Sequence, residues 1–253
     1  MANDTPKTDR TPPSGSPHPG IAETVDALDW KELSATLDQA GATTTGRLLT
    51  PDQCADLVAL YNDETAFRSQ VVMARHGFGS GEYKYLSYPL PALVRTLRTA
   101  LYPHLARIAN HWRSSLGDRA DFPDTHQEFL DICHAAGQSR PTPLLLKYGP
   151  GDYKCLHRDL YGPLVFPLQV VIALSDHQTD FTGGQFVLVE QRPRRQSRAE
   201  VLVPNQGEAI IFAVDERPVT GARGPYRVRM RHGVSRIHDG ERYTLGIIFH
   251  DAA

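Results

Sequence analysis

Two histidines and one aspartate of this chain form a set of side chains that could hold a metal ion. His157 and Asp159 are two positions apart, so on an extended segment both side chains point to the same face and can grip one ion. His232 comes much later and can reach the same ion from another strand. Two imidazoles and one carboxylate are the donors that bind non-haem Fe(II) and leave coordination positions open for oxygen chemistry. The set therefore predicts an iron site.

Arg242 adds an anion-binding group to this set. It opens the predicted last strand, Tyr243 to His250, along which side chains alternate between two faces. Arg242 and Thr244 therefore share one face, while Tyr243 and Leu245 share the other. A planar guanidinium can bind a carboxylate through two parallel hydrogen bonds, which a lysine cannot do. The ordered pattern His-x-Asp, distal His, then Arg is much more specific than any of its parts.

Five segments, in this order, resemble a known enzyme family: Lys147 to Tyr153, His157 to Asp159, Thr182 to Phe186, Gly207 to Phe212, and Arg231 to Leu245. From Gly151 to His250 the chain is similar to the catalytic core of the Fe(II)/2-oxoglutarate-dependent oxygenases, in the branch of prolyl hydroxylases and nucleic-acid demethylases. It also resembles a bacterial subgroup described as acting on damaged DNA. The first half matches only loosely, as a helical support region.

The resemblance implies a set of cofactors: Fe(II), the co-substrate 2-oxoglutarate, and O2, with ascorbate as a further candidate. His157, Asp159 and His232 would bind the iron. Arg242 and Thr244 would hold the distal carboxylate of 2-oxoglutarate, as an Arg-x-Ser pair does in some members.

A tyrosine could add a phenol to the co-substrate site. The candidates are Tyr148 and Tyr153, and Tyr148 is preferred. The expected reaction is hydroxylation of a C–H bond, or demethylation where that carbon is attached to nitrogen. The carboxylate of Asp159 leaves one fewer open position than in halogenating relatives, which lack it, so oxygen insertion is favoured over chlorination.

Several other residues compete for a place in the site. His177, His238 and His250 are alternative third ligands; the first two lie in turn-like contexts, and His250 is expected at the mouth of the last strand. Cys155 could line the site, although a small buried thiol is the preferred reading. Glycines at Gly183, Gly184 and Gly207 are expected to serve sheet corners rather than chemistry.

The elements that position these residues fall into two halves. Helical spacing predicts helices over 22–39, from Thr50-Pro51 onward, over 92–116 and over 124–136, the last capped by Asp124. Between them, 67–74 and 82–86 read as two strands joined by a glycine-rich turn. After Pro143 short apolar runs predict eight strands: 144–148, 154–158, 166–174, 185–189, 199–203, 209–213, 231–235 and 243–250.

This order predicts an α+β chain with a mainly β core, a double-stranded β-helix or jelly roll with N-terminal supporting helices. The expected organisation is a disordered tail over 1–20, a helical support region with a β-hairpin over 21–142, and the catalytic core over 143–253, the last two forming one unit. The 253 residues, with a net charge of −2, are ordinary for a globular protein. Three scattered cysteines, no signal peptide and no membrane span predict a cytoplasmic protein.

The substrate is left open by the sequence. Arginines gather at 192–198 and at 217–231, in expected loops beside the site mouth, and could track the phosphates of a nucleic acid, although a solvated or salt-bridged surface explains them equally well. The alternatives are a protein side chain, as in prolyl hydroxylation, or a small molecule. A non-catalytic or differently metallated cupin is less favoured, because it predicts no aspartate ligand and no dedicated arginine like Arg242.

Overall fold

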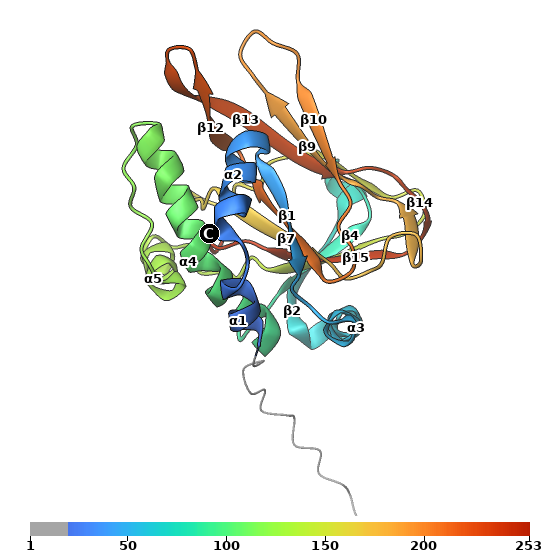
Figure 1. Ribbon diagram of the computed structural model, residues 1–253. Helices are drawn as coiled ribbons and strands as arrows, with labels where there is room; N and C mark the ends of the chain where they lie inside the picture. Colours follow the sequence, from blue (N-terminus) through green and yellow to red (C-terminus); the bar gives the residue numbers. More distant parts are fainter. Residues whose placement is uncertain (1–19) are drawn as a thin grey trace, which may run out of the picture.

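The computed structural model describes residues 20–253 (Figure 1). The tail predicted over 1–20 lies outside these residues except for Gly20, which is the N-cap of the first helix. Two β-sheets face each other, and helices cover one of them. The predicted fold class, a jelly roll with supporting helices, is confirmed.

The larger sheet is antiparallel and has seven strands. In spatial order they are β1 (Ala42–Arg47), β11 (Glu208–Ala213), β7 (Leu168–Ala173), β15 (Arg242–Ile247), β5 (Leu144–Tyr148), β4 (Glu82–Leu86) and β2 (Phe67–Val72). The last strand of the chain therefore lies at the centre, between β7 and β5. Its two faces differ: Leu245 and Ile247 join the core beneath the helices, whereas Arg242 and Thr244 face the space between the sheets.

The smaller sheet provides the opposite wall. Its strands are, in order, β10 (Arg198–Leu202), β9 (Phe186–Gln191), β13 (Gly224–Val234), β6 (Tyr153–His157) and β3 (Gly79–Ser80), and β12 (Glu216–Gly221) also pairs with β13. A separate ribbon joins β8 (Phe181–Gly183) to β14 (Ile237–Gly240). The strands that carry the predicted metal ligands are thus neighbours.

Within the described residues, five α-helices form before the first core strand, β5. They are α1 (Ile21–Asp26), α2 (Trp30–Ala40), α3 (Pro51–Leu60), α4 (Ala92–Ser115) and α5 (His126–Ala135). In Figure 1 α1, α2, α4 and α5 lie on the outer face of the larger sheet. The stripe of leucines predicted for 92–116 is buried there, in the same hydrophobic cluster as Val170, Ile172 and Leu245. No helix of residues 20–253 combines the length and apolarity needed to cross a bilayer.

Side chains that cap helix N-termini explain where the predicted helix boundaries were wrong. The single helix expected over 22–39 is broken, because Asp29 caps a new helix by accepting a hydrogen bond from the Glu32 amide. The last helix is capped by Thr125, not Asp124. The capping box predicted at Thr50 and Gln53 is present.

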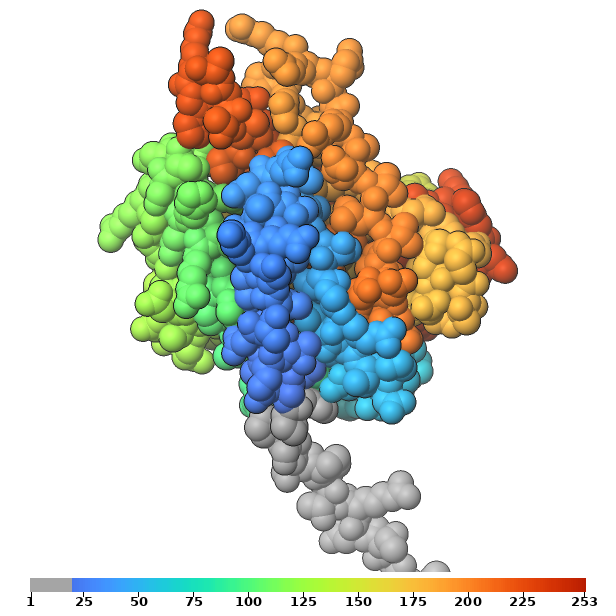
Figure 2. Space-filling view, viewed as in Figure 1, coloured from blue at the N-terminus to red at the C-terminus, as the bar shows by residue number. Residues whose placement is uncertain are grey.

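The β-structure contains strands that the sequence reading missed. β1 was not predicted, and its small polar residues pair along β11 at the edge of the larger sheet. The segment 217–231, expected as a loop, is the hairpin of β12 and β13. The tips of this hairpin and of β9–β10 project from the same end of the molecule (Figures 1 and 2).

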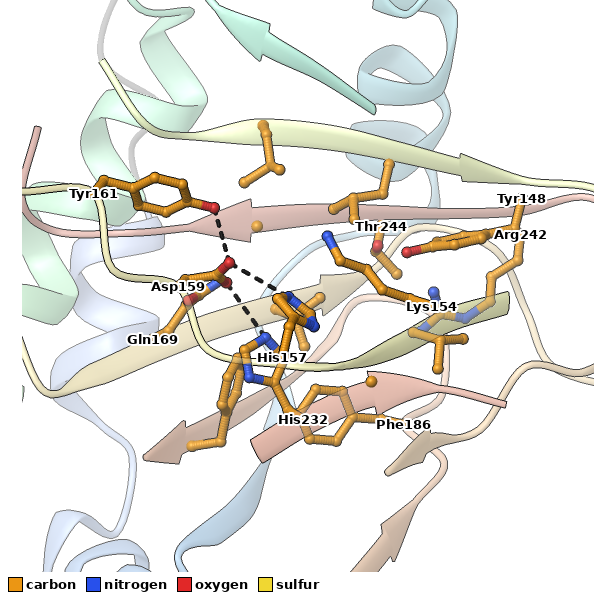
Figure 3. Close-up of a pocket in the computed structure, with 17 residues that line it drawn as sticks. Tyr148, Lys154, His157, Asp159, Tyr161, Gln169, Phe186, His232, Arg242 and Thr244 are labelled. Carbon is orange, nitrogen blue, oxygen red and sulfur yellow. Dashed lines mark hydrogen bonds and ion pairs between the residues drawn. The ribbon is translucent and has the colours of Figure 1, made fainter. Parts of the chain in front are cut away.

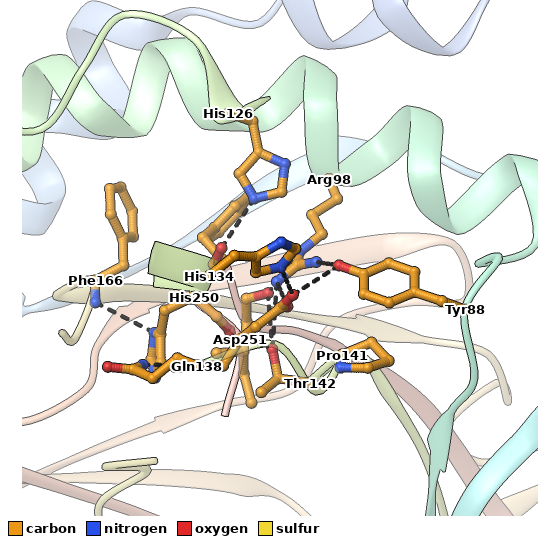
Figure 4. A network of polar contacts seen from close by, with 12 residues as sticks. Tyr88, Arg98, His126, His134, Gln138, Pro141, Thr142, Phe166, His250 and Asp251 are labelled. Carbon is orange, nitrogen blue, oxygen red and sulfur yellow. Dashed lines mark hydrogen bonds and ion pairs between the residues drawn. The ribbon is translucent and has the colours of Figure 1, made fainter. Parts of the chain in front are cut away.

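A buried ion pair fastens the end of the chain to the helical layer (Figure 4). Arg98 of α4 binds Asp251 at 2.8 Å, and both side chains are almost fully buried. The second carboxylate oxygen of Asp251 accepts hydrogen bonds from both Tyr88 and His134. Burial opposes ionisation of Asp251, but Arg98 and these donors outweigh it and hold the pKa of the carboxyl below its usual value.

Replacing Arg98 with methionine is expected to lower the free energy of unfolding by about 3–5 kcal/mol, because it leaves the Asp251 carboxylate buried without its cation. Since the folded pKa of Asp251 is depressed, its contribution is present above the unfolded-state value of about 3.9 and disappears as the pH falls through the folded value. The deficit of the variant should therefore shrink in acid. Urea unfolding at neutral and acidic pH measures both effects.

A matched control is the exposed ion pair between Arg113 and Asp121. Because solvent screens that pair, Arg113→Met should change stability by less than about 1 kcal/mol. Equal losses for the two variants would show that the buried pair has no special role.

Candidate metal centre

The two predicted histidine ligands face each other across a strand pair. β6 and β13 run antiparallel with His157 directly opposite His232, so both imidazoles leave the same face of the smaller sheet. Their ring centroids are 4.2 Å apart. Asp159 follows β6 by two residues and turns back between them: the Nε2 atoms of His157 and His232 each lie 3.3 Å from one of its carboxylate oxygens (Figure 3).

These donor atoms fit a metal ion better than they fit one another. The Nδ1 of His157 lies 2.9 Å from the backbone carbonyl oxygen of Cys155 and donates its proton there, which leaves a lone pair on Nε2. That Nε2 is buried and makes no hydrogen bond within the described residues. Nitrogen and oxygen ligands lie about 2.0–2.2 Å from a first-row divalent ion, so neighbouring ligands stand about 3 Å apart. The observed 3.3 Å separations match that arrangement.

The protonation states also suit metal binding. Burial, reinforced by the neighbouring His157, lowers the pKa of His232 to about 4, so its imidazole is neutral near pH 7. Burial disfavours the charged form of Asp159, but the two adjacent imidazoles outweigh it and hold the pKa of the carboxyl well below its usual value. The Tyr161 hydroxyl donates to Asp159 Oδ1 at 2.8 Å and thereby orients the carboxylate.

A pocket of about 480 Å³, counted to the open solvent at its mouth, connects this triad to the three residues predicted to bind the co-substrate. Arg242, Thr244 and Tyr148 line its far end. Burial lowers the pKa of Arg242, and of the surrounding groups only Tyr148 opposes that shift. Gly184 leaves room for the arginine, because a Cβ there would come within 2.9 Å of its Cδ.

The groups at this end of the pocket lack partners within the described residues. The side chain of Arg242 makes no ion pair with a carboxylate there, although it is only 4% exposed. The Tyr148 hydroxyl is buried without a hydrogen bond. A buried cation beside a hydroxyl without a hydrogen bond lowers the stability of the fold unless a ligand pairs with both groups. A carboxylate can do so, because it accepts hydrogen bonds from the guanidinium and from the hydroxyl.

The structure separates the remaining candidates from the site. Tyr153 points to the surface, where Arg236 lies over its ring. Of the two tyrosines predicted for the co-substrate site, Tyr148 is therefore the one that lines the pocket. His238 is exposed on β14, and neither it nor His177 belongs to the ligand cluster. His250 was expected at the strand mouth but is buried, and its Nδ1 accepts a hydrogen bond from the Phe166 amide.

The preferred reading of Cys155 as a buried thiol is wrong, because its side chain is exposed. Three polar residues that line the pocket were not predicted: Lys154, Tyr161 and Gln169. Gln169 carried a weak signal, as an amide within the apolar run 164–174, and its Oε1 is buried without a hydrogen bond. For Tyr161 and Lys154, no spacing pattern in the sequence indicated that they would line the pocket.

Most of the clustered arginines are engaged in ion pairs. Arg217 is buried and pairs with Glu190, which also binds Arg192. Arg227 and Arg229 both pair with Glu216. Arg198 pairs with Glu200. The interpretation of a salt-bridged surface therefore holds for these five, and the unpaired arginines of the described chain include Arg194, Arg195 and Arg223 at the two hairpin tips.

Sequence comparison places the site within a family. The sequence model of a family described as "Oxygenase, catalysing oxidative methylation of damaged DNA" matches residues 81–252, which is more than half of the chain and includes the triad and Arg242. Uncharacterized proteins from two strains of Mycobacterium tuberculosis are each 54% identical over 165 residues, covering 65% of this chain and 71% of the relative.

Solved structures with the same fold include two enzymes of nogalamycin biosynthesis. The non-haem alpha-ketoglutarate-dependent epimerase SnoN has a TM-score of 0.53 at 15% identity, covering 86% of this chain and 80% of the other. The carbocyclase SnoK has a TM-score of 0.51 at 17% identity, with 94% and 88% covered. These likenesses support the fold, and the family match confirms the predicted oxygenase resemblance.

Proposed function

This protein belongs to the oxygenase family described above and is an enzyme of that class, and we propose that it oxidises a substrate C–H bond with Fe(II), 2-oxoglutarate and O2. In this proposal His157, Asp159 and His232 bind the iron. Arg242, Thr244 and Tyr148 bind the distal carboxylate of 2-oxoglutarate. The observation that carries the proposal is one pocket with a three-donor metal cluster at one end and an unpaired buried arginine at the other.

The protein's own groups would have three tasks in this reaction. The bound iron, with 2-oxoglutarate and O2, supplies the oxidising chemistry. The Cys155 carbonyl and the Tyr161 hydroxyl hold His157 and Asp159 in the orientation and protonation state that ligation requires. Arg242 fixes the direction of the dicarboxylate, so that its other end reaches the triad.

Apolar walls complete the site. Phe186, Phe212 and Val171 line the same pocket as the triad and limit the access of water to it. The Phe212 and His232 ring centroids are 4.6 Å apart, so the imidazole of His232 is held in place by packing against Phe212 as well as by its position on β13. A bound substrate would present its C–H bond to this enclosed volume.

We propose alkylated nucleic acid as the substrate and oxidative removal of an alkyl group as the outcome. The support is the family description, which names damaged DNA. Arginines that make no ion pair within residues 20–253, and could therefore meet phosphates, include Arg194, Arg195 and Arg223, on hairpin tips at one end of the molecule. Incubation with an N-methylated oligonucleotide, Fe(II) and 2-oxoglutarate should release formaldehyde and succinate together. Turnover of 2-oxoglutarate with a protein or small-molecule substrate only would contradict this assignment.

Binding of a methylated single strand should weaken as salt rises, with a logarithmic slope of about −0.7 for each phosphate contacted. Replacing Arg194, Arg195 and Arg223 together with alanine should make the slope shallower. The control replaces Arg227 and Arg229, whose charges are already paired on the protein. Fluorescence anisotropy across a salt series measures the slope for each variant. Identical slopes for the tip variant and the wild type would show that the hairpin tips do not contact the nucleic acid.

A further inference from the structure

Strand β6 contains an irregularity beside the metal ligands. His157 pairs with His232, but Lys154 pairs with Val234, so two residues of β6 stand opposite the single residue Gly233. This is a β-bulge, which inserts one extra residue and shifts the alternation of side chains. In a regular strand, positions three apart face opposite sides. Here Lys154 and His157 face the same side.

The exposure of the bulged residues and the close approach of the neighbouring strand both support this description. Cys155 and Leu156, consecutive in the chain, are both exposed, whereas a regular strand would send one of them inward. Gly233 is needed opposite, because a Cβ at this position would lie 2.7 Å from the Lys154 carbonyl oxygen. The pairing of a bulge with a glycine indicates that the strand is built to turn Lys154 into the pocket.

Lys154 enters the pocket without an anionic partner. Its amine lies 4.6 Å from the centre of the Tyr83 ring, and the side chain lines the pocket together with the triad (Figure 3). Burial lowers the pKa of the amine, and Asp159 is the group that counteracts this. Within the described residues no carboxylate comes close enough to pair with it. An ammonium withdrawn from water in this way is costly unless a ligand supplies a negative charge.

The two unpaired cations of the pocket stand at different ends. Arg242 interacts electrostatically with Tyr148, at the end away from the triad. Lys154 lies on β6 three residues before His157, and its side chain extends toward the triad in Figure 3, so its amine belongs to the triad end. A ligand that satisfied both would carry one negative charge at each end.

We propose that Lys154 binds the carboxylate at the metal-binding end of 2-oxoglutarate, so that the co-substrate is held between Lys154 and Arg242. This inference rests on the proposed function. It assigns the second carboxylate of the dianion to a residue that the bulge in β6 places, and it makes Lys154 a binding residue rather than a core lysine.

The test measures binding to the Mn(II)-loaded protein by calorimetry, with 2-oxoglutarate and with oxalate as probes. Oxalate can chelate the metal but has no distal carboxylate to meet Arg242. Lys154→Met keeps the length of the side chain and removes the charge, and it should weaken both probes by about 10- to 100-fold, as the loss of a charge-assisted hydrogen bond does. Arg242→Met should weaken 2-oxoglutarate alone. Lys154→Arg should bind both probes nearly as well as the wild type.

A second readout separates binding from a structural role. Lys154→Met should bind Mn(II) at least as tightly as the wild type, because it removes a positive charge near a divalent cation. Its thermal stability without ligands should be unchanged or higher, since a partly desolvated ammonium is lost. Weaker Mn(II) binding by this variant would assign the loss of oxalate to a damaged metal site and overturn the proposal.

The outcomes distinguish this inference from the function on which it rests. A wild-type protein that binds Mn(II) but not 2-oxoglutarate would contradict the proposed function itself. A wild type that binds 2-oxoglutarate, with Lys154→Met equal to it for both probes, would overturn only the role of Lys154. In that case the amine faces the primary substrate instead.

Discussion

Replacing His232 with alanine is expected to abolish both metal binding and turnover while leaving the fold intact. The imidazole is one of three donors in the cluster, and two donors alone cannot complete the ligand set. Loss of groups that merely orient a ligand costs about 10- to 100-fold in metal affinity or activity, so loss of the ligand itself should cost more. Calorimetric titration with Mn(II), together with succinate production under Fe(II), measures the two effects.

Thermal denaturation provides a test that does not depend on catalysis. Metal ions that bind only the folded state should raise the melting temperature of the wild type but not that of His232→Ala. His238→Ala is the matched control, because His238 is exposed on β14 away from the cluster. If His238→Ala lost the metal while His232→Ala kept it, the assignment of the distal ligand would be wrong.

Arg242→Met is expected to weaken 2-oxoglutarate binding by about 30- to several thousand-fold, which corresponds to about 2–5 kcal/mol for a buried charged pair that loses one partner. The arginine is buried and the described residues supply no anion for it, so its partner has to come with a ligand. The measurement is calorimetry with Mn(II) in place of iron.

The same substitution should have the opposite effect on the protein without ligands. An unpaired buried guanidinium opposes folding, so Arg242→Met should melt at the same temperature as the wild type or higher. Arg236→Met is the control, because Arg236 lies over the Tyr153 ring at the surface. Unchanged affinity for 2-oxoglutarate in Arg242→Met would remove this residue from the co-substrate site.

The His157 and Asp159 part of the donor cluster could be predicted from the sequence because its geometry is local. The two-residue spacing of His157 and Asp159 puts both on one face of any extended segment, and no distant contact is needed to align them. Thr244 follows Arg242 by the same rule. Eight predicted core strands overlap with observed ones, since apolar alternation between turn residues reports burial directly. The boundaries failed where a side chain, such as that of Asp29 or Thr125, capped a helix at another point.

Which surface arginines are paired with carboxylates could not be predicted from the sequence. Arginine clustering at 192–198 and 217–231 looked like a phosphate-binding rim, yet Arg217 is buried against Glu190 and others pair with Glu216. Ion pairing joins residues far apart in the chain, and the strand hairpin that brings them together was itself missed. The alternating charged residues of this hairpin are typical of a loop and of an exposed strand alike, so the pattern did not distinguish the two.

The sequence alone therefore predicted the three candidate donors, the strand segments of the core and the face that Arg242 shares with Thr244. The spacings within His157–Asp159 and within Arg242–Thr244 each depend on one segment only. Only the tertiary structure decided that Tyr148 rather than Tyr153 lines the pocket, that Tyr161 orients Asp159, and that Lys154 joins them. Each of these depends on pairing between segments. The bulge in β6 exists only in register with β13, and one extra residue there reverses which side chains face the pocket.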